Sequence, residues 1–231
     1  MKVGIIAPVS MLDEYCTTNI QYCLPKLLVE NERYRDFYKK RKKQKNIIII
    51  DSRRVGTWKR EPEEYSIIVK ALDILRPDYF ILPSWMFNQK RTIAEVKRFI
   101  GNLLPVPNNL VACLEGTNEK EIVMLRKLLS KDLTIKSFAL PEHIQTFCKT
   151  VECDNSIIYI ENHLRVEELN GLDGILITSL PVRLGLQGRL LSDYLPGPPS
   201  LTFHENEDRF PKVIERNIKE LLEYYEVQKG E

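Results

Sequence analysis

The sequence predicts a compact α/β protein of the (β/α)8, or TIM-type, barrel class, and three observations lead to this fold. Short apolar runs of four to six residues alternate with longer amphipathic stretches, an order typical of repeated βα units. These runs are apolar throughout, as in parallel strands that are covered on both faces. The length of 231 residues fits one small barrel, so we expect residues 1–231 to form a single domain.

Seven apolar runs are predicted strands, namely residues 3–7, 46–50, 79–82, 110–114, 135–139, 157–160 and 174–178, and an eighth is expected near residues 201–203. Helical patterns cover residues 22–43, 62–75, 92–104, 118–130, 141–151, 165–169 and 210–225. Thr92 and Glu95 have the spacing of a capping box at the start of one helix. An open doubly wound sheet is the alternative, but the chain has neither GxGxxG nor GxxxxGK[ST], the motifs that often accompany it.

The composition limits the other classes of protein. The net charge is only +2, and no segment reaches the ~18 apolar residues that span a bilayer. The cysteines form no CxxC pair, and the three histidines show no metal-ligand spacing. We therefore expect free thiols, no metal, no cofactor and a cytoplasmic location. The cysteines are Cys16, Cys23, Cys113, Cys148 and Cys153.

Polar residues that follow the predicted strands are the first candidates for a functional site, because the carboxyl ends of the strands carry the active site in such barrels. Asp51 is the strongest candidate, since a run of four isoleucines delivers one carboxylate at its end. Such a group can act as a general acid or base, or it can cap the following turn. Further candidates at strand ends are Ser52, Ser84, Glu115, Gly116, Glu161, Thr178, Ser179 and Arg183.

A basic run reads RYRDFYKKRKKQK over residues 33–45. We expect it to contact the phosphates of a nucleic acid, although a solvated helix face would have the same pattern. Its aromatic residues Tyr34, Phe37 and Tyr38 could stack on bases or form the buried face of the same helix. The predicted nucleic-acid-binding residues are Lys39, Lys40, Arg41, Lys42, Lys43, Arg53 and Arg54.

Four passages of the chain carry a resemblance to a known family. They read RYRDFYKKRKKQKNIIIIDS, IIIIDSRRVG, RPDYFILPSWMFNQKRT and YIENHLRVEELNGLDGILITSLPVRLGLQGR. In their order and spacing they resemble the tRNA-guanine transglycosylase superfamily, and most of all its compact DNA 7-deazaguanine transglycosylase branch from phages and bacteria. The resemblance extends between residues 30 and 190.

This resemblance implies a pentosyltransferase that exchanges guanine for a 7-deazaguanine in a nucleic acid, with the target base flipped out of its stack. Asp51 matches the general acid/base aspartate of the family. Glu115 and Gly116 fall on a Gln-Gly pair that contacts the base, and Ser84 falls on a base-reading aspartate. DNA is favoured over tRNA as the partner, with guanine or 7-deazaguanine as the base.

The nucleophile is the main departure from the family pattern. Ile177 stands where the nucleophilic aspartate would precede Thr-Ser, and Asp173 could replace it only in a different register. Asp51 and Glu161 are then an alternative catalytic pair. The zinc-binding Cys/His motif of the tRNA enzymes is missing, so no zinc-binding subdomain is expected.

Three functions therefore remain open from the sequence. The first is a transglycosylase-like enzyme that acts on nucleic acid. The second is a catalytically silent relative that binds nucleic acid, a second copy of the chain or an active paralogous subunit. The third is a small-molecule nucleobase or nucleoside enzyme built on the same barrel.

Overall fold

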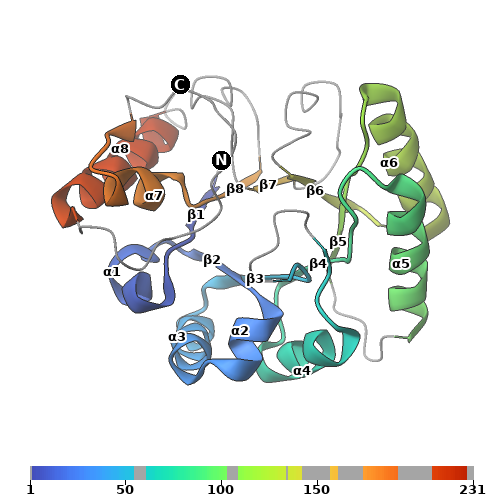
Figure 1. Ribbon diagram of the computed structural model, residues 1–231, viewed down its shortest axis with the longest axis horizontal. Coiled ribbons are helices and arrows are strands. Elements are labelled where there is room, and N and C mark those ends of the chain that lie inside the picture. The colour runs from blue at the N-terminus through green and yellow to red at the C-terminus, as the bar shows by residue number, and fades with distance from the viewer. Residues whose placement is uncertain are drawn as a thin grey trace.

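The computed structural model describes residues 2–54, 61–102, 109–133, 135–141, 157–160, 174–191 and 210–227. Within them, eight parallel strands form one closed barrel in chain order, with helices around it (Figure 1). The first strand, β1 (Lys2–Ile5), closes the ring by pairing with β2 (Ile20–Cys23) and β8 (Ile175–Thr178). The predicted (β/α)8 barrel is therefore confirmed.

The other elements follow in the order expected of repeated βα units. The remaining strands are β3 (Ile47–Asp51), β4 (Tyr79–Ile81), β5 (Leu110–Cys113), β6 (Ser137–Pro141) and β7 (Ile157–Ile160). The helices are η1 (Val9–Met11), α1 (Leu12–Tyr15), α2 (Pro25–Glu30), α3 (Glu32–Lys43), α4 (Tyr65–Leu75), α5 (Gln89–Asn102), α6 (Glu119–Leu133), α7 (Leu180–Leu186) and α8 (Pro211–Val227). No helix among the described residues is long and apolar enough to cross a membrane.

Strand β2 is the strand that the sequence pattern does not predict, and helices η1, α1 and α7 also lie outside the predicted helical patterns. The pattern predicts one helix over residues 22–43, whereas the structure has a strand and two helices there. Leu24 is extended, with a ψ of 137°, as is favoured before a proline. Asn31 separates the two helices, and its side-chain oxygen accepts a hydrogen bond from the Tyr34 N–H at 2.9 Å. Residues 201–203 lie outside the described residues, and the barrel already closes with eight strands without them.

The predicted capping box at Thr92 is wrong. Helix α5 begins three residues earlier, at Gln89, and the side-chain oxygen of Asn88 accepts from the Arg91 N–H at 3.0 Å. Thr92 is buried in the first turn, where its hydroxyl accepts from the Trp85 N–H at 2.9 Å and donates to the Trp85 carbonyl at 3.3 Å. The threonine therefore holds the preceding loop instead of starting the helix.

Side-chain hydrogen bonds do cap the start of α6. The side-chain oxygen of Asn118 accepts from the Glu121 N–H at 3.1 Å, and the Glu121 carboxylate accepts from the Thr117 N–H at 2.8 Å. These hydrogen bonds from Thr117 lower the pKa of Glu121. Of the other predicted helices, residues 142–151 and 165–169 lie outside the described part of the chain, and Pro141 is the last residue of β6.

Two hydrophobic layers make up the core. The barrel interior contains side chains from strands, among them Ile49, Ile81 and Ile177. The second layer lies between strands and helices and includes Ile48 and Ile50. Because side chains alternate along a strand, this division places Asp51 on the interior side of β3.

The described cysteines, Cys16, Cys23 and Cys113, are free and buried, as the sequence predicts. Burial raises the pKa of the Cys16 thiol to about 12 and raises that of Cys23 as well. These thiols are therefore protonated, and inert as nucleophiles. Cys148 and Cys153 lie outside the described residues.

Replacing Gly185 by alanine is expected to destabilise the fold. An added Cβ would lie 2.3 Å from Cγ1 and 2.7 Å from Cα of Ile214 on α8, so α7 and α8 would have to separate. Overpacking of this kind typically costs ~1–3 kcal/mol, which urea unfolding followed by circular dichroism measures. Gly101 is the matched control, since nothing lies within 4 Å of its added Cβ. Alanine there should be neutral or stabilise by up to about 1 kcal/mol, and equal effects at the two sites would contradict the packing argument.

Candidate functional site

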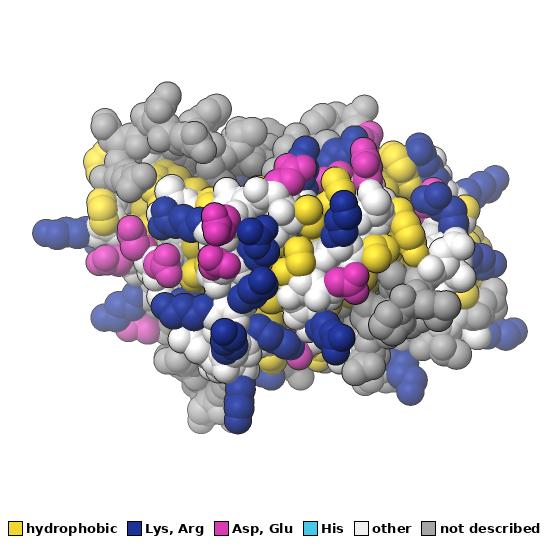
Figure 2. All heavy atoms as spheres, turned by 90° about the horizontal axis from the view of Figure 1, so that it is seen from below, with side chains coloured by type: hydrophobic (Ala, Val, Ile, Leu, Met, Phe, Trp, Pro, Cys, Tyr) yellow, Lys and Arg dark blue, Asp and Glu magenta, His cyan; other side chains and the backbone are white. Residues whose placement is uncertain are grey.

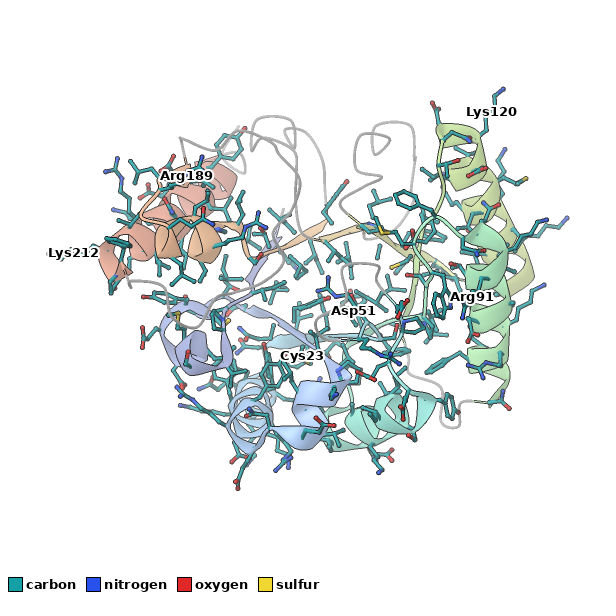
Figure 3. The ribbon with its side chains drawn as sticks, in the orientation of Figure 1. Cys23, Asp51, Arg91, Lys120, Arg189 and Lys212 are labelled. Atoms are coloured by element: carbon teal, nitrogen blue, oxygen red, sulfur yellow. The ribbon has the colours of Figure 1, made fainter. Side chains whose placement is uncertain are left out.

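Asp51 lies inside the ring of strands at the carboxyl end of β3 (Figure 3). Asp51 is 1% exposed, and its carboxylate accepts hydrogen bonds from Tyr22 and Arg53 within the described part of the chain. The Tyr22 hydroxyl of β2 donates to Oδ2 at 2.5 Å, and the Arg53 N–H donates to Oδ1 at 3.1 Å. Because a buried carboxylate needs donors to stay ionised, this arrangement stabilises its charged form.

Arg53 extends this contact into a chain of hydrogen bonds. Its guanidinium donates to the Tyr22 hydroxyl at 3.1 Å and lies 5.9 Å from the centre of the Tyr22 ring. The Tyr22 oxygen therefore accepts from arginine while its proton points to Asp51. Hydrogen bonds arranged in sequence polarise one another, so the three side chains act as one unit.

A short antiparallel pairing follows Asp51. The Glu63 N–H donates to the Ser52 carbonyl and the Arg54 N–H donates to the Glu61 carbonyl, each at 2.7 Å. Arg54 also pairs with Glu63 at 3.6 Å, where the Glu63 side chain is only 4% exposed. Ser52 is buried in this pairing. The predicted residues Ser52, Arg53 and Arg54 thus lie together beside Asp51.

The next two strands bring a second pair of polar residues to the same end of the barrel. Ser84 follows β4 and donates to the carboxylate of Glu115, which follows β5, at 3.1 Å. Glu115 is fully buried. Gly116 comes next, and a Cβ there would lie 3.1 Å from the side chains of Glu121 and Ile122, so the turn into α6 is tight. Polar groups therefore occupy the carboxyl ends of four neighbouring strands, β2 to β5.

Thr178 and Ser179 occupy the carboxyl end of β8, across the closure at β1. Both are buried, and the Thr178 hydroxyl accepts from the Leu180 N–H at 3.0 Å. Ser179 precedes α7, and Arg183 is half-buried one turn into this helix. Ile177, at the position where the resemblance implies a nucleophile, is fully buried in the barrel interior.

The basic residues of α3 lie at the other end of the barrel. Lys42 donates to the Asp78 carboxylate at 2.8 Å, and that carboxylate also accepts from the Ile48 N–H at the start of β3. Arg41 lies over the Phe37 ring at 5.0 Å. Asp51 ends the same strand, about 13 Å from its first residue, Ile47, at a rise of ~3.3 Å per residue. The structure therefore separates the predicted nucleic-acid-binding residues into two groups, with Lys39, Lys40, Arg41, Lys42 and Lys43 at the amino end and Arg53 and Arg54 at the carboxyl end.

The aromatic residues of the basic run form the buried face of α3. Tyr34, Phe37 and Tyr38 all belong to the core, and the Tyr38 hydroxyl donates to the Tyr22 carbonyl at 2.6 Å. Burial raises the pKa of both tyrosines. These rings are therefore not available for stacking on bases.

Two predicted catalytic residues, Glu161 and Asp173, lie outside the described residues. Within the described ranges, no three His, Cys, Asp or Glu side chains are grouped so that they could hold a metal ion. The pairing of Asp51 with Glu161 or Asp173 therefore stays a prediction.

Tyr22 and Glu63 are site residues that the sequence pattern does not indicate. Tyr22 was hidden by the helix predicted over residues 22–43, although Ile20 and Tyr22 alternate with Gln21 and Cys23 as in a strand. Glu63 looks like its exposed neighbour Glu64 in EPEEY. Nothing in that local sequence distinguishes the glutamate that becomes buried.

Comparison with known proteins supplies no family for the chain. No protein-family model matches it, and no curated protein matches it. Among solved structures it is similar to orotidine 5'-phosphate decarboxylase from Thermotoga maritima, with 13% identity, a TM-score of 0.48, and coverage of 77% of this chain and 88% of that chain.

Two further solved structures have similar values. N-(5'-phosphoribosyl)anthranilate isomerase from Pyrococcus furiosus has 12% identity and a TM-score of 0.46, over 96% of this chain and 99% of that chain. N-acetylneuraminate lyase from Mycoplasma synoviae has 10% identity and a TM-score of 0.48, over 97% of each chain. At these identities we draw no chemical conclusion from the likenesses. The strand pairing of this chain by itself shows that it is a TIM-type barrel. Its buried polar site lies at the carboxyl ends of β2 to β5.

The Tyr22–Asp51 hydrogen bond is expected to give a measurable coupling in a double-mutant cycle. We expect Tyr22→Phe and Asp51→Ala to be non-additive in unfolding free energy by about 1.5–3 kcal/mol, the range for hydrogen bonds to charged groups. Tyr38→Phe is the control, because its hydroxyl donates to the Tyr22 backbone carbonyl and not to Asp51. That pair should be close to additive with Asp51→Ala. A coupling energy no larger than that of the control pair would show that the Tyr22–Asp51 hydrogen bond contributes nothing to the free energy of unfolding.

Proposed function

We propose that this protein is an enzyme that binds a small polar molecule at the carboxyl end of its barrel and uses Asp51 to move a proton. The observation that carries the proposal is the buried Asp51 carboxylate with its Tyr22 and Arg53 donors. Its position at a strand's carboxyl end is the one that supplies catalytic groups in such barrels.

A role in folding alone is a weaker account of this carboxylate. Moving an ionised group into a barrel interior is costly unless it is well paired, and the residues before it on β3 are all isoleucine. An apolar residue at position 51 would continue the same core. Retaining a charge there, with two further side chains arranged around it, favours a use in binding or proton transfer.

The substrate that fits this proposal is a nucleobase or nucleoside, acting as a small molecule. The resemblance to tRNA-guanine transglycosylases suggests a guanine-type base, and the Ser84–Glu115 pair offers polar groups to hydrogen-bond its edge. Ile177 gives no nucleophile at the family's position. The basic run that could hold a polymer lies at the far end of β3 from Asp51. We therefore place the small-molecule reaction first and base exchange in DNA or tRNA second.

Replacing Asp51 by asparagine is expected to lower turnover about 100- to 10,000-fold, the usual contribution of a general acid or base. Radiolabelled guanine or a 7-deazaguanine would be incubated with the protein and, in separate reactions, with guanosine, DNA or tRNA. Exchange into guanosine alone supports the small-molecule reaction, whereas label in DNA or tRNA supports the polymer reaction.

Asp78→Asn is the matched control for that assay, because Asp78 is also a hydrogen-bonded carboxylate but lies at the amino end. It should keep turnover within a few-fold of wild type. Turnover that survives in folded Asp51→Asn would exclude Asp51 as the proton-transferring group. Absence of label with all three acceptors would exclude base exchange by this protein.

Nucleic-acid binding at the amino end is a second candidate function. Lys39, Lys40 and Lys43 are exposed on α3, and Lys and Arg side chains gather on the face formed by α2, α3 and α4 (Figure 2). Lys42 forms an ion pair with Asp78. A polyanion bound here would not reach Asp51, so this function is separate from the proposed reaction.

Changing Lys39, Lys40 and Lys43 together to glutamate is expected to weaken binding to duplex DNA and to flatten its dependence on salt, because fewer counterions are released. Fluorescence anisotropy at salt concentrations from about 50 to 200 mM measures both the affinity for DNA and its dependence on salt. The control carries the same charge change on α6, at the exposed residues Lys120, Lys127 and Lys131. Equal loss in both variants would point to net charge and not to α3.

A further inference from the structure

We propose that Arg91 and Trp85 form an oxyanion-binding subsite at the rim of the barrel, which takes a phosphate or carboxylate group of the substrate. This inference rests on the proposed function and narrows its substrate to a nucleobase or nucleoside that carries such an anionic group, but the subsite itself is separate from Asp51. Trp85 lies in the loop after β4, and Arg91 is in the first turn of α5, beside the helix in Figure 3.

The two side chains are stacked. The central carbon of the Arg91 guanidinium lies 3.2 Å from the centre of the Trp85 ring. At this separation the guanidinium must lie nearly parallel to the ring, because an edge-on approach would drive its nitrogens into the ring. Stacking fixes the plane of the guanidinium and leaves its N–H groups directed outward, which suits planar recognition of an oxyanion.

Arg91 has no carboxylate partner among the described residues, although acids lie nearby. Glu95, one turn along α5, pairs with Arg98 at 2.7 Å. The Glu121 carboxylate accepts from the Thr117 N–H and hydroxyl. The first turn of α5 contains no acidic residue. The positive charge of Arg91 is therefore exposed and uncompensated by an ion pair in the described part of the chain, as a site for an anionic ligand requires.

The indole of Trp85 is the platform on which the guanidinium is stacked. Its Nε1–H is buried and has no hydrogen-bond partner within the described residues, and leaving such a donor unpaired costs about 1–3 kcal/mol. The guanidinium and the indole lie in stacked planes 3.2 Å apart. Because the indole nitrogen is buried, an oxyanion meets the outward N–H groups of Arg91 and not the indole N–H. The indole contributes by holding the guanidinium, and its unpaired N–H is part of the cost of that arrangement.

The loop that carries Trp85 is held in place on both sides. Thr92 bonds both the N–H and the carbonyl of Trp85, and Gln89 donates to the Glu121 carbonyl at 2.6 Å. Phe87 has a φ of 56° and is 53% exposed. Left-handed backbone at such a residue costs roughly 1–3 kcal/mol and occurs often at ligand clamps. A loop built at this cost presents a preformed site.

The subsite adjoins the proposed active site. Trp85 directly follows Ser84, whose hydroxyl donates to Glu115. A charged group of the substrate that is anchored at Arg91 would be remote from the reacting atoms. Binding energy from such a remote group can position the rest of the molecule for reaction.

Tryptophan fluorescence tests the subsite directly. The chain has two tryptophans, so Trp58→Phe leaves Trp85 as the only one. In this background the protein would be titrated with inorganic phosphate, with acetate and with chloride at constant ionic strength. We expect a saturable change with phosphate or acetate and none with chloride. A response to phosphate alone identifies a phosphate site, and a response to acetate alone identifies a carboxylate site.

Variants separate the subsite from general charge effects. Arg91→Met should abolish the response, and Arg91→Lys should weaken affinity about tenfold because lysine lacks the planar fork. Lys90→Met removes the same charge from the same turn and should retain the response. Asp51→Asn should also retain it, so loss of turnover and loss of anion binding remain distinguishable. No saturable response to either oxyanion, or equal loss in Arg91→Met and Lys90→Met, would overturn the proposal.

Discussion

Closure of the barrel at β1 is the constraint on which the rest of the structure depends. Gly4 pairs with Ile20 of β2 and with Ile177 of β8. A Cβ on Gly4 would lie 2.8 Å from the Ile177 side chain and 2.9 Å from that of Ile20. The two isoleucines thus fill the space that a side chain of β1 would need. Once the ring is closed, alternate residues of each strand point into it, and Asp51 faces the interior.

Most of the fold could be predicted because a parallel barrel repeats one pattern, an apolar run followed by an amphipathic helix. β2 could not, because a polar residue interrupts its short run. Gln21 is buried, with its amide bonded to the carbonyls of Cys16 and Thr18. The fold of the preceding segment brings these two carbonyls close to Gln21, and the local sequence pattern does not indicate them. Because a helix was predicted over residues 22–43, Tyr22 was not recognised as a strand residue.

The candidate site was predictable to a similar degree. Asp51, Ser84 and Glu115 follow from the rule that strand ends carry function, and the structure brings them to one end of the barrel. The Tyr22 hydroxyl reaches Asp51 only because β2 and β3 are neighbours, which the sequence alone leaves open. Arg53 was predicted, but as a nucleic-acid-binding residue and not as a partner of Asp51. The basic run was predicted from composition, and composition carries no information about which end of the barrel it occupies. Its position directly before β3 is what places it at the amino end.

Asp51 also determines how β3 can be aligned with its neighbours. The strand reads IIIID, and four identical apolar side chains give no preference for one face over the other. A slip of one residue would turn every side chain over. The carboxylate would then face the layer against the helices and lose the Tyr22 hydroxyl. A single carboxyl group therefore selects one alignment for a strand whose other residues are interchangeable, so the side chain proposed for chemistry also supplies specificity in folding.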